Sequence, residues 1–305
     1  MIACYDLARC PPTYDVVAFL ALAEKERLHR GEEYLDIRIL PGPADGFRAD
    51  SLWPHTVEER VQMRDKVLVP LCHLLPSVRS VEVVEKPRAG HDIRGCWGTG
   101  EYFIGLGAIV RALEMGSRPL RESGTLITGT LQSGMLVPQT SSKMITFTLR
   151  EAAHYPLRNS RVEQWTAAAA DLAAAGYEVC LIRDAARAHE PLSGPGENLS
   201  VGVDPGAATD IEERAHAYAT ALLNVGICNG PMWMSIFMDA PTLMLRPTTN
   251  EAGGCYDDSF YSQFGLKRGS QLPTSPPYQR LVWEEDTCDN IVRAVEDMLV
   301  AGELA

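Results

Sequence analysis

The chain has 305 residues, a length that predicts about two domains, and its 46% hydrophobic and 22% charged residues are typical of a globular protein with a sizeable core. Its 40 acidic and 28 basic residues give a formal net charge of −12. This charge disfavours general binding to nucleic acid or anionic membranes, because both present phosphate groups, but it is compatible with one local basic pocket for a phosphorylated ligand. No apolar run is long enough to span a bilayer.

The eight cysteines and the start of the chain indicate a reducing compartment. None of the cysteines forms a CxxC pair and several lie in apolar runs, so we expect reduced, mostly buried thiols and no zinc site. The start, MIACYDLARCPPTYD, lacks the basic residues and long apolar stretch of a signal peptide. We therefore expect a cytoplasmic protein.

The first half of the sequence alternates strand-like apolar runs with helix-like amphipathic runs. We expect strands over 2–7, 35–40 and 80–85. Helices are expected from near Thr13 to Gly31, from about Thr56 to Leu75, and after the glycine-rich segment 95–107. This segment lacks the spacing of the dinucleotide fingerprint and of the P-loop lysine motif. Residues 117–141, rich in Gly, Ser and Thr, are either an interdomain connection or additional strands.

The second half repeats the alternation more regularly. Strands are expected over 144–149, 178–183, 199–203, 222–228, 241–247 and 279–283. Two helices are predicted by capping boxes, Ser160 with Glu163 and Thr209 with Glu212, a short apolar helix is expected over 232–239, and the last helix follows Thr287.

Strands alternating with helices predict right-handed crossovers and parallel sheets. We expect an α/β fold with two facing Rossmann-like domains, 1–141 and 142–305, and a cleft between them. Ligands of open parallel sheets bind beyond the carboxyl ends of the strands, so the loops that follow the strands are the candidate sites.

Three arginines cluster after the expected strand 144–149: Arg150, Arg158 and Arg161, with Asn159 between them. Guanidinium groups bind phosphate through paired hydrogen bonds, and the start of the following helix adds unpaired N–H groups with partial positive charge. This cluster predicts a phosphate site. The alternative interpretation is a set of surface arginines paired with neighbouring acids.

A second cradle for an anion follows the strand 222–228. Asn229, Gly230, Pro231 and Met232 form a strand-to-helix turn in which glycine allows close approach of the backbone and proline suits the first helical turn. The alternative interpretation is an ordinary connection between a strand and a helix.

Two carboxylates complete the set of candidates. Asp184 follows the strand 178–183, where an acidic residue can accept hydrogen bonds from a ribose or sugar hydroxyl, or can simply be a solvated loop acid. Asp15 lies in the first turn of the first helix, where a carboxylate can take a proton from an attacking hydroxyl or stabilise the helix dipole. Asp6 is a nearby competitor for the same role. The sequence has no GxSxG, HExxH or DxD motif.

The order of these elements resembles a known family. The run ITFTLREA, then RNSRVEQW, CLIRD and TDIEERAHAYATALLNVGICNGPMWMSIFMDAPTLML, is similar to the C-terminal half of GT-B glycosyltransferases, and the lipopolysaccharide heptosyltransferase type in particular. That type has an N-D-x-G-P-M-H-like turn before a short helix. Residues 229–232 match part of this turn, whereas Trp233 stands where histidine would be and the aspartate has no clear counterpart. Asp15 fits the family's proposed catalytic base.

The resemblance implies a glycosyltransferase of GT-B architecture that needs no metal and no other cofactor. The donor would be a nucleoside-diphosphate sugar on the C-terminal domain, and the acceptor a glycan, a lipid-linked glycan or a small molecule with a free hydroxyl. Two alternatives stay open. One is a nucleotide-sugar epimerase or hydrolase of the same fold, and the other is a non-catalytic protein that binds a nucleotide sugar.

Overall fold

The computed structural model describes residues 1–49, 55–85, 96–116, 118–120, 143–190, 201–246 and 257–303. The chain divides into two compact units, one of Met1–Ser123 with Phe237–Asp239 and the other of Gly124–Ile236 with Ala240–Ala305. The boundary expected between 141 and 142, and most of 117–141, lie outside the described residues. Each unit is an α/β structure on a parallel sheet, as the alternation of elements predicts.

The first unit contains a parallel sheet in the order β1-β2-β3. Its elements are β1 (Ile2–Asp6), α1 (Val16–His29), β2 (Leu35–Leu40), α2 (Val57–Met63), a π-helical turn (Arg64–Leu68), α3 (Val69–His73), β3 (Val78–Val83) and α4 (Gly105–Glu114). The expected helix from Thr56 to Leu75 is therefore present but interrupted. The interruption precedes Pro70, which cannot donate an α-helical hydrogen bond.

An aromatic cluster explains the glycine-rich segment after residue 95. The Phe19 ring lies 5.2 Å from the rings of Tyr5 and Phe103 and 5.6 Å from that of Trp97. Gly98 follows Trp97 with φ +82°, and a Cβ there would lie 2.9 Å from the carbonyl oxygen of β1 and 3.2 Å from Phe19. Glycine is thus required by packing against β1, which is a structural role.

The second unit contains a parallel sheet in the order β6-β5-β4-β7-β8-β9. Its strands are β4 (Met144–Thr148), β5 (Glu178–Ile182), β6 (Val201–Val203), β7 (Leu223–Ile227), β8 (Thr242–Leu245) and β9 (Gln279–Val282). Its helices are α5 (Val162–Ala174), α6 (Pro205–Thr209), α7 (Ile211–Thr220), α8 (Gly230–Phe237), α9 (Asp258–Ser262) and α10 (Cys288–Glu303), with 3₁₀ turns at Pro156–Arg158 and Ala185–Arg187.

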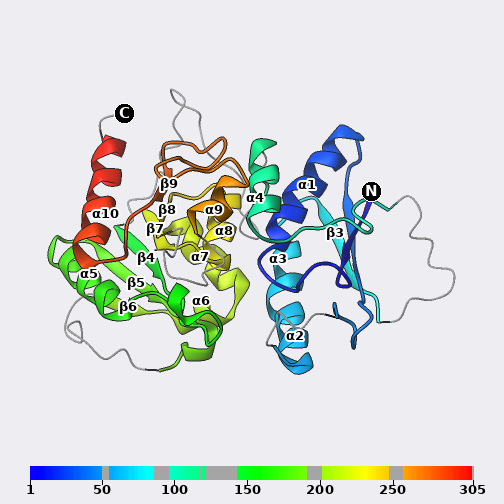
Figure 1. Ribbon diagram of the computed structural model, residues 1–305, viewed down its shortest axis with the longest axis horizontal. Helices are drawn as coiled ribbons and strands as arrows, with labels where there is room; N and C mark the ends of the chain where they lie inside the picture. The colour runs from blue at the N-terminus through cyan, green and yellow to red at the C-terminus, as the bar shows by residue number, and fades with distance from the viewer. Residues whose placement is uncertain are drawn as a thin grey trace. The chain divides into compact units, whose positions relative to one another are not determined.

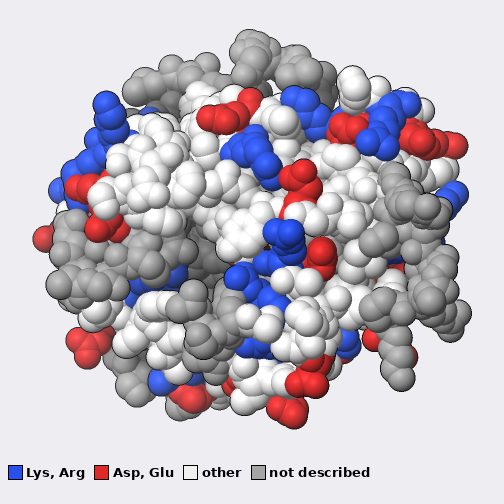
Figure 2. All heavy atoms as spheres, turned by 45° about the vertical axis from the view of Figure 1, so that its right-hand side comes forward, with Lys and Arg blue, Asp and Glu red and all other residues white. Residues whose placement is uncertain are grey.

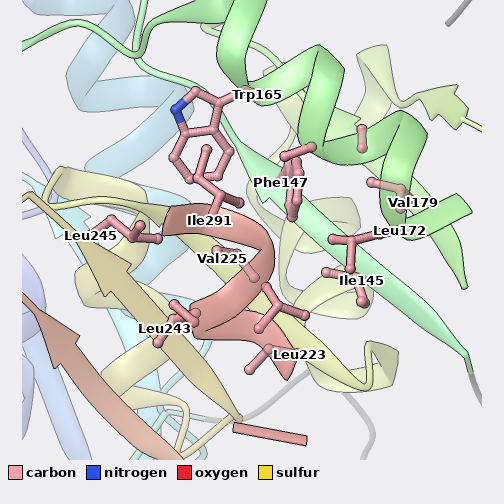
Figure 3. Close-up of a cluster of buried hydrophobic side chains, with 14 of the residues drawn as sticks. Ile145, Phe147, Trp165, Leu172, Val179, Leu223, Val225, Leu243, Leu245 and Ile291 are labelled. Atoms are coloured by element: carbon pink, nitrogen blue, oxygen red, sulfur yellow. The ribbon is translucent and has the colours of Figure 1, made fainter. Parts of the chain in front are cut away.

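Helices α5 and α10 pack together over one face of this sheet (Figure 1), and a buried apolar cluster lies between them and the strands (Figure 3). The Phe147 ring of β4 meets the Trp165 ring of α5 edge to face, with centroids 5.0 Å apart. Ile291 of α10 is fully buried in the same cluster. Each such side chain contributes about 1.5–3 kcal/mol by leaving water, so this cluster holds α5 and α10 against the sheet.

The two predicted capping boxes are wrong in detail. Ser160 does not cap α5, because its hydroxyl accepts a hydrogen bond from the Arg150 N–H at 2.9 Å instead. Helix α7 is capped by Asp210, whose Oδ1 accepts from the N–H groups of Glu212 and Glu213, while Thr209 donates to a carbonyl of the preceding helix. The helices form where expected, since their buried faces do not depend on the identity of the cap.

The seven described cysteines are free thiols, and Cys4, Cys10, Cys72 and Cys228 among them are buried. Burial raises the pKa of the Cys72 thiol to about 12, so this group stays protonated and unreactive at neutral pH. On the surface, Figure 2 shows basic and acidic side chains interspersed over one face, with several basic side chains gathered near the middle of the view.

Candidate functional site

The order of strands places two loops at the point where a parallel sheet binds ligands. From β4 the chain moves outward through β5 to β6, then returns to β7 on the other side of β4 and continues to β9. Ligands of such sheets bind outside the carboxyl ends of the strands at this reversal. The loop that contains Arg150 follows β4, and the turn that begins at Asn229 follows β7.

A direct contact joins these two loops. Nη2 of Arg158, in the loop after β4, donates a hydrogen bond to the carbonyl of Cys228, directly after β7, over 3.3 Å. The Arg158 side chain is only partly buried. Burial raises the pKa of the Cys228 thiol, and the positive charge of Arg158 partly offsets this rise. The structure therefore brings Arg158 to the start of α8.

The start of α8 offers an incomplete set of N–H groups. Asn229 is buried and caps the helix, because its Oδ1 accepts a hydrogen bond from the N–H of Met232 over 3.1 Å. Pro231 has no N–H group. Gly230, the first residue of α8, is partly exposed.

Met232 is a packing residue. Its side chain is fully buried and lies against Gly226 of β7. A Cβ on Gly226 would come within 2.7 Å of the Met232 sulfur and 3.0 Å of the Thr148 carbonyl oxygen. The contact seats the first turn of α8 on the end of β7, and so positions Gly230.

Arg150 organises the loop after β4 from inside. The residue is 7% exposed, and its guanidinium donates to the carbonyls of His154 and Tyr155, over 2.8 and 3.0 Å, and to the side-chain oxygen of Asn159. Tyr155 is in the left-handed region, at φ +51°, and its ring is half exposed. These bonds hold a backbone conformation that costs energy in a non-glycine residue, so Arg150 supports the loop.

Asn159 forms hydrogen bonds within the loop after β4 and with the residue that follows β8. Its Nδ2 donates to the carbonyl of Ala152 over 2.9 Å, while its Oδ1 accepts from Arg150. Its backbone carbonyl accepts a hydrogen bond of 2.6 Å from Arg246, which directly follows β8. Its side chain is thus engaged inside the protein rather than turned toward a ligand.

Arg161 is an ion-paired surface residue. Its Nη2 lies 2.5 Å from Glu285 and its Nε 3.7 Å from Asp286. Nearby carboxylates therefore balance its charge, which corresponds to the alternative interpretation of the arginine cluster. We leave Arg161 out of the phosphate site for this reason.

Asp184 is also engaged locally. It begins the 3₁₀ turn after β5, and its Oδ1 accepts from the N–H of Ala186 over 3.4 Å. The preceding residue, Arg183, forms a buried bidentate ion pair with Glu151, which holds the pKa of Arg183 above its ordinary value. Glu151 follows β4, so this pair ties the ends of two neighbouring strands together.

The sequence analysis missed Arg183, Arg246 and Asp286. The signal was present for the arginines, because β4, β5 and β8 are followed by the same pattern of an apolar residue and arginine, in TLR, LIR and MLR. The arginines of these three patterns, Arg150, Arg183 and Arg246, are at most 8% exposed. Asp286 gives no local signal, since its hydrogen-bond donors lie more than 100 positions away along the chain, at the start of α5 and within it.

Asp15, the candidate base, lies in the first unit at the start of α1. Its Oδ2 accepts from the Thr13 hydroxyl over 3.0 Å and its Oδ1 from the N–H of Gly105 over 3.1 Å. Gly105 begins α4, so the carboxylate ties the starts of two helices together.

The comparisons with known proteins give structural similarities only. No family model matches the chain, and no curated protein matches it. A solved structure of Escherichia coli heptosyltransferase WaaC with ADP aligns with TM-score 0.48 and 13% identity over 98% of this chain and 100% of that one.

Two further structures align over similar lengths. WaaC with ADP-2-deoxy-2-fluoro heptose gives TM-score 0.45 and 12% identity over 99% of this chain and 100% of that one. The glycosyl transferase family 9 structure from Veillonella parvula DSM 2008 gives TM-score 0.43 and 11% identity over 98% and 97%. The two WaaC structures are of the type that the sequence resembles.

Membrane-spanning helices and metal-binding clusters are both absent from the part of the chain that the structure describes. None of the described helices combines the length and apolar character that crossing a membrane requires. Over the same residues, no group of three or more His, Cys, Asp or Glu side chains is arranged to hold a metal ion.

Proposed function

We propose that this chain is a glycosyltransferase that moves a sugar from a nucleoside-diphosphate sugar to an acceptor hydroxyl. The donor diphosphate binds at the carboxyl edge of the larger sheet, where β4 and β7 are neighbours. The observation that carries the proposal is the contact of Arg158 with the Cys228 carbonyl, because it sets a partly exposed guanidinium beside the start of α8.

The chemistry follows from the charges at this point. When the bond between the sugar and the diphosphate breaks, the leaving diphosphate gains negative charge. Arg158 and the N–H of Gly230 stabilise that charge, and the positive end of the α8 dipole adds to their effect. This cationic and dipolar set takes the place of a metal ion in the proposal.

The acceptor is activated by a carboxylate, for which we propose Asp15. Its oxygen takes the proton of the acceptor hydroxyl as the acceptor oxygen forms a bond to the anomeric carbon and the diphosphate departs. A direct displacement of this kind inverts the anomeric centre. We do not assign Arg150, Asn159, Arg161 or Asp184 to contacts with the donor, because Arg150 and Asn159 are bonded within their loop, Arg161 is ion-paired at the surface and Asp184 accepts a hydrogen bond within its own turn.

A second candidate function is a protein that binds a nucleotide sugar without turning it over. The contacts of Asp15 favour it, because both carboxylate oxygens already accept hydrogen bonds, one from Thr13 just before α1 and one from the N–H of Gly105 at the start of α4. Under this alternative the diphosphate site is the same, and Asp15 is only a structural residue.

The binding site is tested by thermal unfolding with ADP, UDP, GDP and CDP, comparing the wild type with Arg158→Met and Arg293→Met. A diphosphate that binds the native state at 100 times its Kd stabilises it by about 2.7 kcal/mol, which raises the Tm by several degrees. We expect this shift in the wild type and in Arg293→Met, whose arginine is an exposed ion-pair partner of Glu284. We expect little or no shift in Arg158→Met. A full shift in Arg158→Met would remove the proposed site.

The reaction is tested with the sugar form of the diphosphate that stabilises the chain. Transfer to a member of a panel of glycan, lipid-linked and small-molecule acceptors, abolished in Asp15→Asn, supports the transferase. Free sugar or an epimer formed without acceptor indicates the hydrolase or epimerase. Tight binding with no turnover indicates the second candidate, and full activity in Asp15→Asn excludes this residue as the base.

A further inference from the structure

Asp286 is a fully buried carboxylate that joins three elements. It lies between β9 and α10 and is 0% exposed. Its Oδ2 accepts hydrogen bonds from the indole N–H of Trp165 over 2.9 Å and from the backbone N–H of Arg161 over 3.0 Å. Its Oδ1 lies 3.4 Å from Nη1 of Arg246. A buried charge in water-excluded surroundings needs such partners, so Asp286 and Arg246 depend on each other.

Arg246 extends this contact to the loop after β4. It is 8% exposed, and its backbone is in the left-handed region, at φ +45°, with its N–H shared between the carbonyls of Val282 and Glu284. Its Nη2 donates to the Asn159 carbonyl over 2.6 Å. Its Nε is buried and has no hydrogen-bond acceptor within the described ranges. The guanidinium thus spans from Asp286 to Asn159.

Asn159 links Arg246 to the two arginines of the loop, Arg150 and Arg158. Its peptide is directly attached to Arg158, and its side chain accepts from Arg150. An unbroken set of contacts therefore runs from Asp286 through Arg246 and Asn159 to the loop that carries Arg158. The Asp286 carboxylate also holds the other end of the loop, because it accepts a hydrogen bond from the backbone N–H of Arg161, the residue directly before α5.

We propose that Asp286 is a positioning residue for the diphosphate site, which it serves by holding Arg246 against the Asn159 carbonyl. It touches no ligand itself. The proposal rests on the proposed function for what the loop binds, but the positioning of the loop is a property of the free protein. Neutralising Asp286 leaves Arg246 as a buried cation without its partner, and the loop after β4 then loses the bond at Asn159.

The first test needs no ligand. Amide hydrogen exchange is measured on the wild type, Asp286→Asn and Asp210→Asn, the last neutralising the carboxylate that caps α7 in the same unit. In Asp286→Asn we expect exchange at least about ten times faster in residues 151–160, with the central strands β4 and β7 unchanged. In Asp210→Asn we expect unchanged exchange in 151–160. Unchanged exchange of 151–160 in Asp286→Asn, or an equal rise throughout the unit, would overturn the proposal.

Trp165 gives a local spectroscopic signature. Its indole N–H resonance should shift in Asp286→Asn, because a neutral amide oxygen replaces the carboxylate that it bonds. If Asp286→Asn does not fold, Arg246→Lys is the second variant, since an ammonium keeps the charge but cannot bridge Asp286 and Asn159 as the guanidinium does. The same selective exchange in 151–160 is then expected, and its absence contradicts the proposal.

The second test links the loop to binding. For whichever nucleoside diphosphate stabilises the wild type, we expect Asp286→Asn to raise the Kd about tenfold, which corresponds to about 1.4 kcal/mol, and Asp210→Asn to leave it unchanged. An unchanged Kd in folded Asp286→Asn rejects the link to the site. If no diphosphate binds the wild type, the proposed function fails, and the exchange experiment still decides whether Asp286 positions the loop.

Discussion

At the residue scale, arginines that look alike in the sequence have different roles because their surroundings differ. Arg150 is buried and its guanidinium is committed to the carbonyls of its own loop. Arg158 is partly exposed at the start of α8, and Arg161 is paired with Glu285. Of these three, Arg158 is the one whose guanidinium lies beside the start of α8, where we propose that the diphosphate binds.

This difference predicts that Arg150→Met and Arg158→Met separate stability from binding. Arg150→Met leaves the carbonyls of His154 and Tyr155 without their donor, and hydrogen bonds to charged groups contribute about 1.5–3 kcal/mol each. We expect the free energy of unfolding of Arg150→Met to fall by about 2–4 kcal/mol in urea denaturation. Arg158→Met should lose less than about 1 kcal/mol. Equal stability of the two variants would show that Arg150 does not support the loop.

The sequence predicted the positions of these residues but not their partners. Arg158 reaches the Cys228 carbonyl because β4 and β7 are neighbours in the sheet, and the strand pattern predicts a parallel sheet but not this order of strands. The ion pairs that neutralise Arg161 and Arg246 involve residues near 285, contributed by the connection between β9 and α10. No local pattern indicates a contact over such a separation, so Arg161 was expected in the phosphate site and Asp286 was not predicted.

At the element scale, the position of α8 depends on how its first turn packs on β7. Gly226 lies within β7, where β-branched residues are favoured, yet Met232 occupies the space that a side chain would need. The start of α8 is therefore set by a glycine in the strand as well as by the cap at Asn229.

Gly226→Ala is expected to lower the free energy of unfolding by about 1–3 kcal/mol, because the added methyl group displaces Met232 and approaches the Thr148 carbonyl. It should also weaken diphosphate binding, since Gly230 moves with the first turn. Gly202→Ala is the matched control, as Gly202 lies in β6 of the same sheet and a methyl group there would have no atom within 4 Å among the described residues. Urea denaturation and diphosphate titration of both variants measure the two effects. Equal behaviour of the two alanine variants would contradict this packing account.

At the scale of the whole molecule, the alternation of elements predicted most of the structure. Each expected strand among the described residues is present within two residues of its predicted ends, because short β-branched and apolar runs bounded by turns are typical of strands. The irregular parts were less predictable. The π-helical turn before Pro70 and the left-handed Tyr155 depend on packing and on distant donors rather than on propensity.

The central claim is that a donor diphosphate binds between Arg158 and the first turn of α8. The most direct measurement is a crystal structure of the chain with the nucleoside diphosphate that stabilises it most. We predict diphosphate oxygens within hydrogen-bond distance of the Arg158 guanidinium and of the Gly230 N–H, at the carboxyl ends of β4 and β7. A diphosphate bound elsewhere, with Arg158 still directed at the Cys228 carbonyl, would contradict the account.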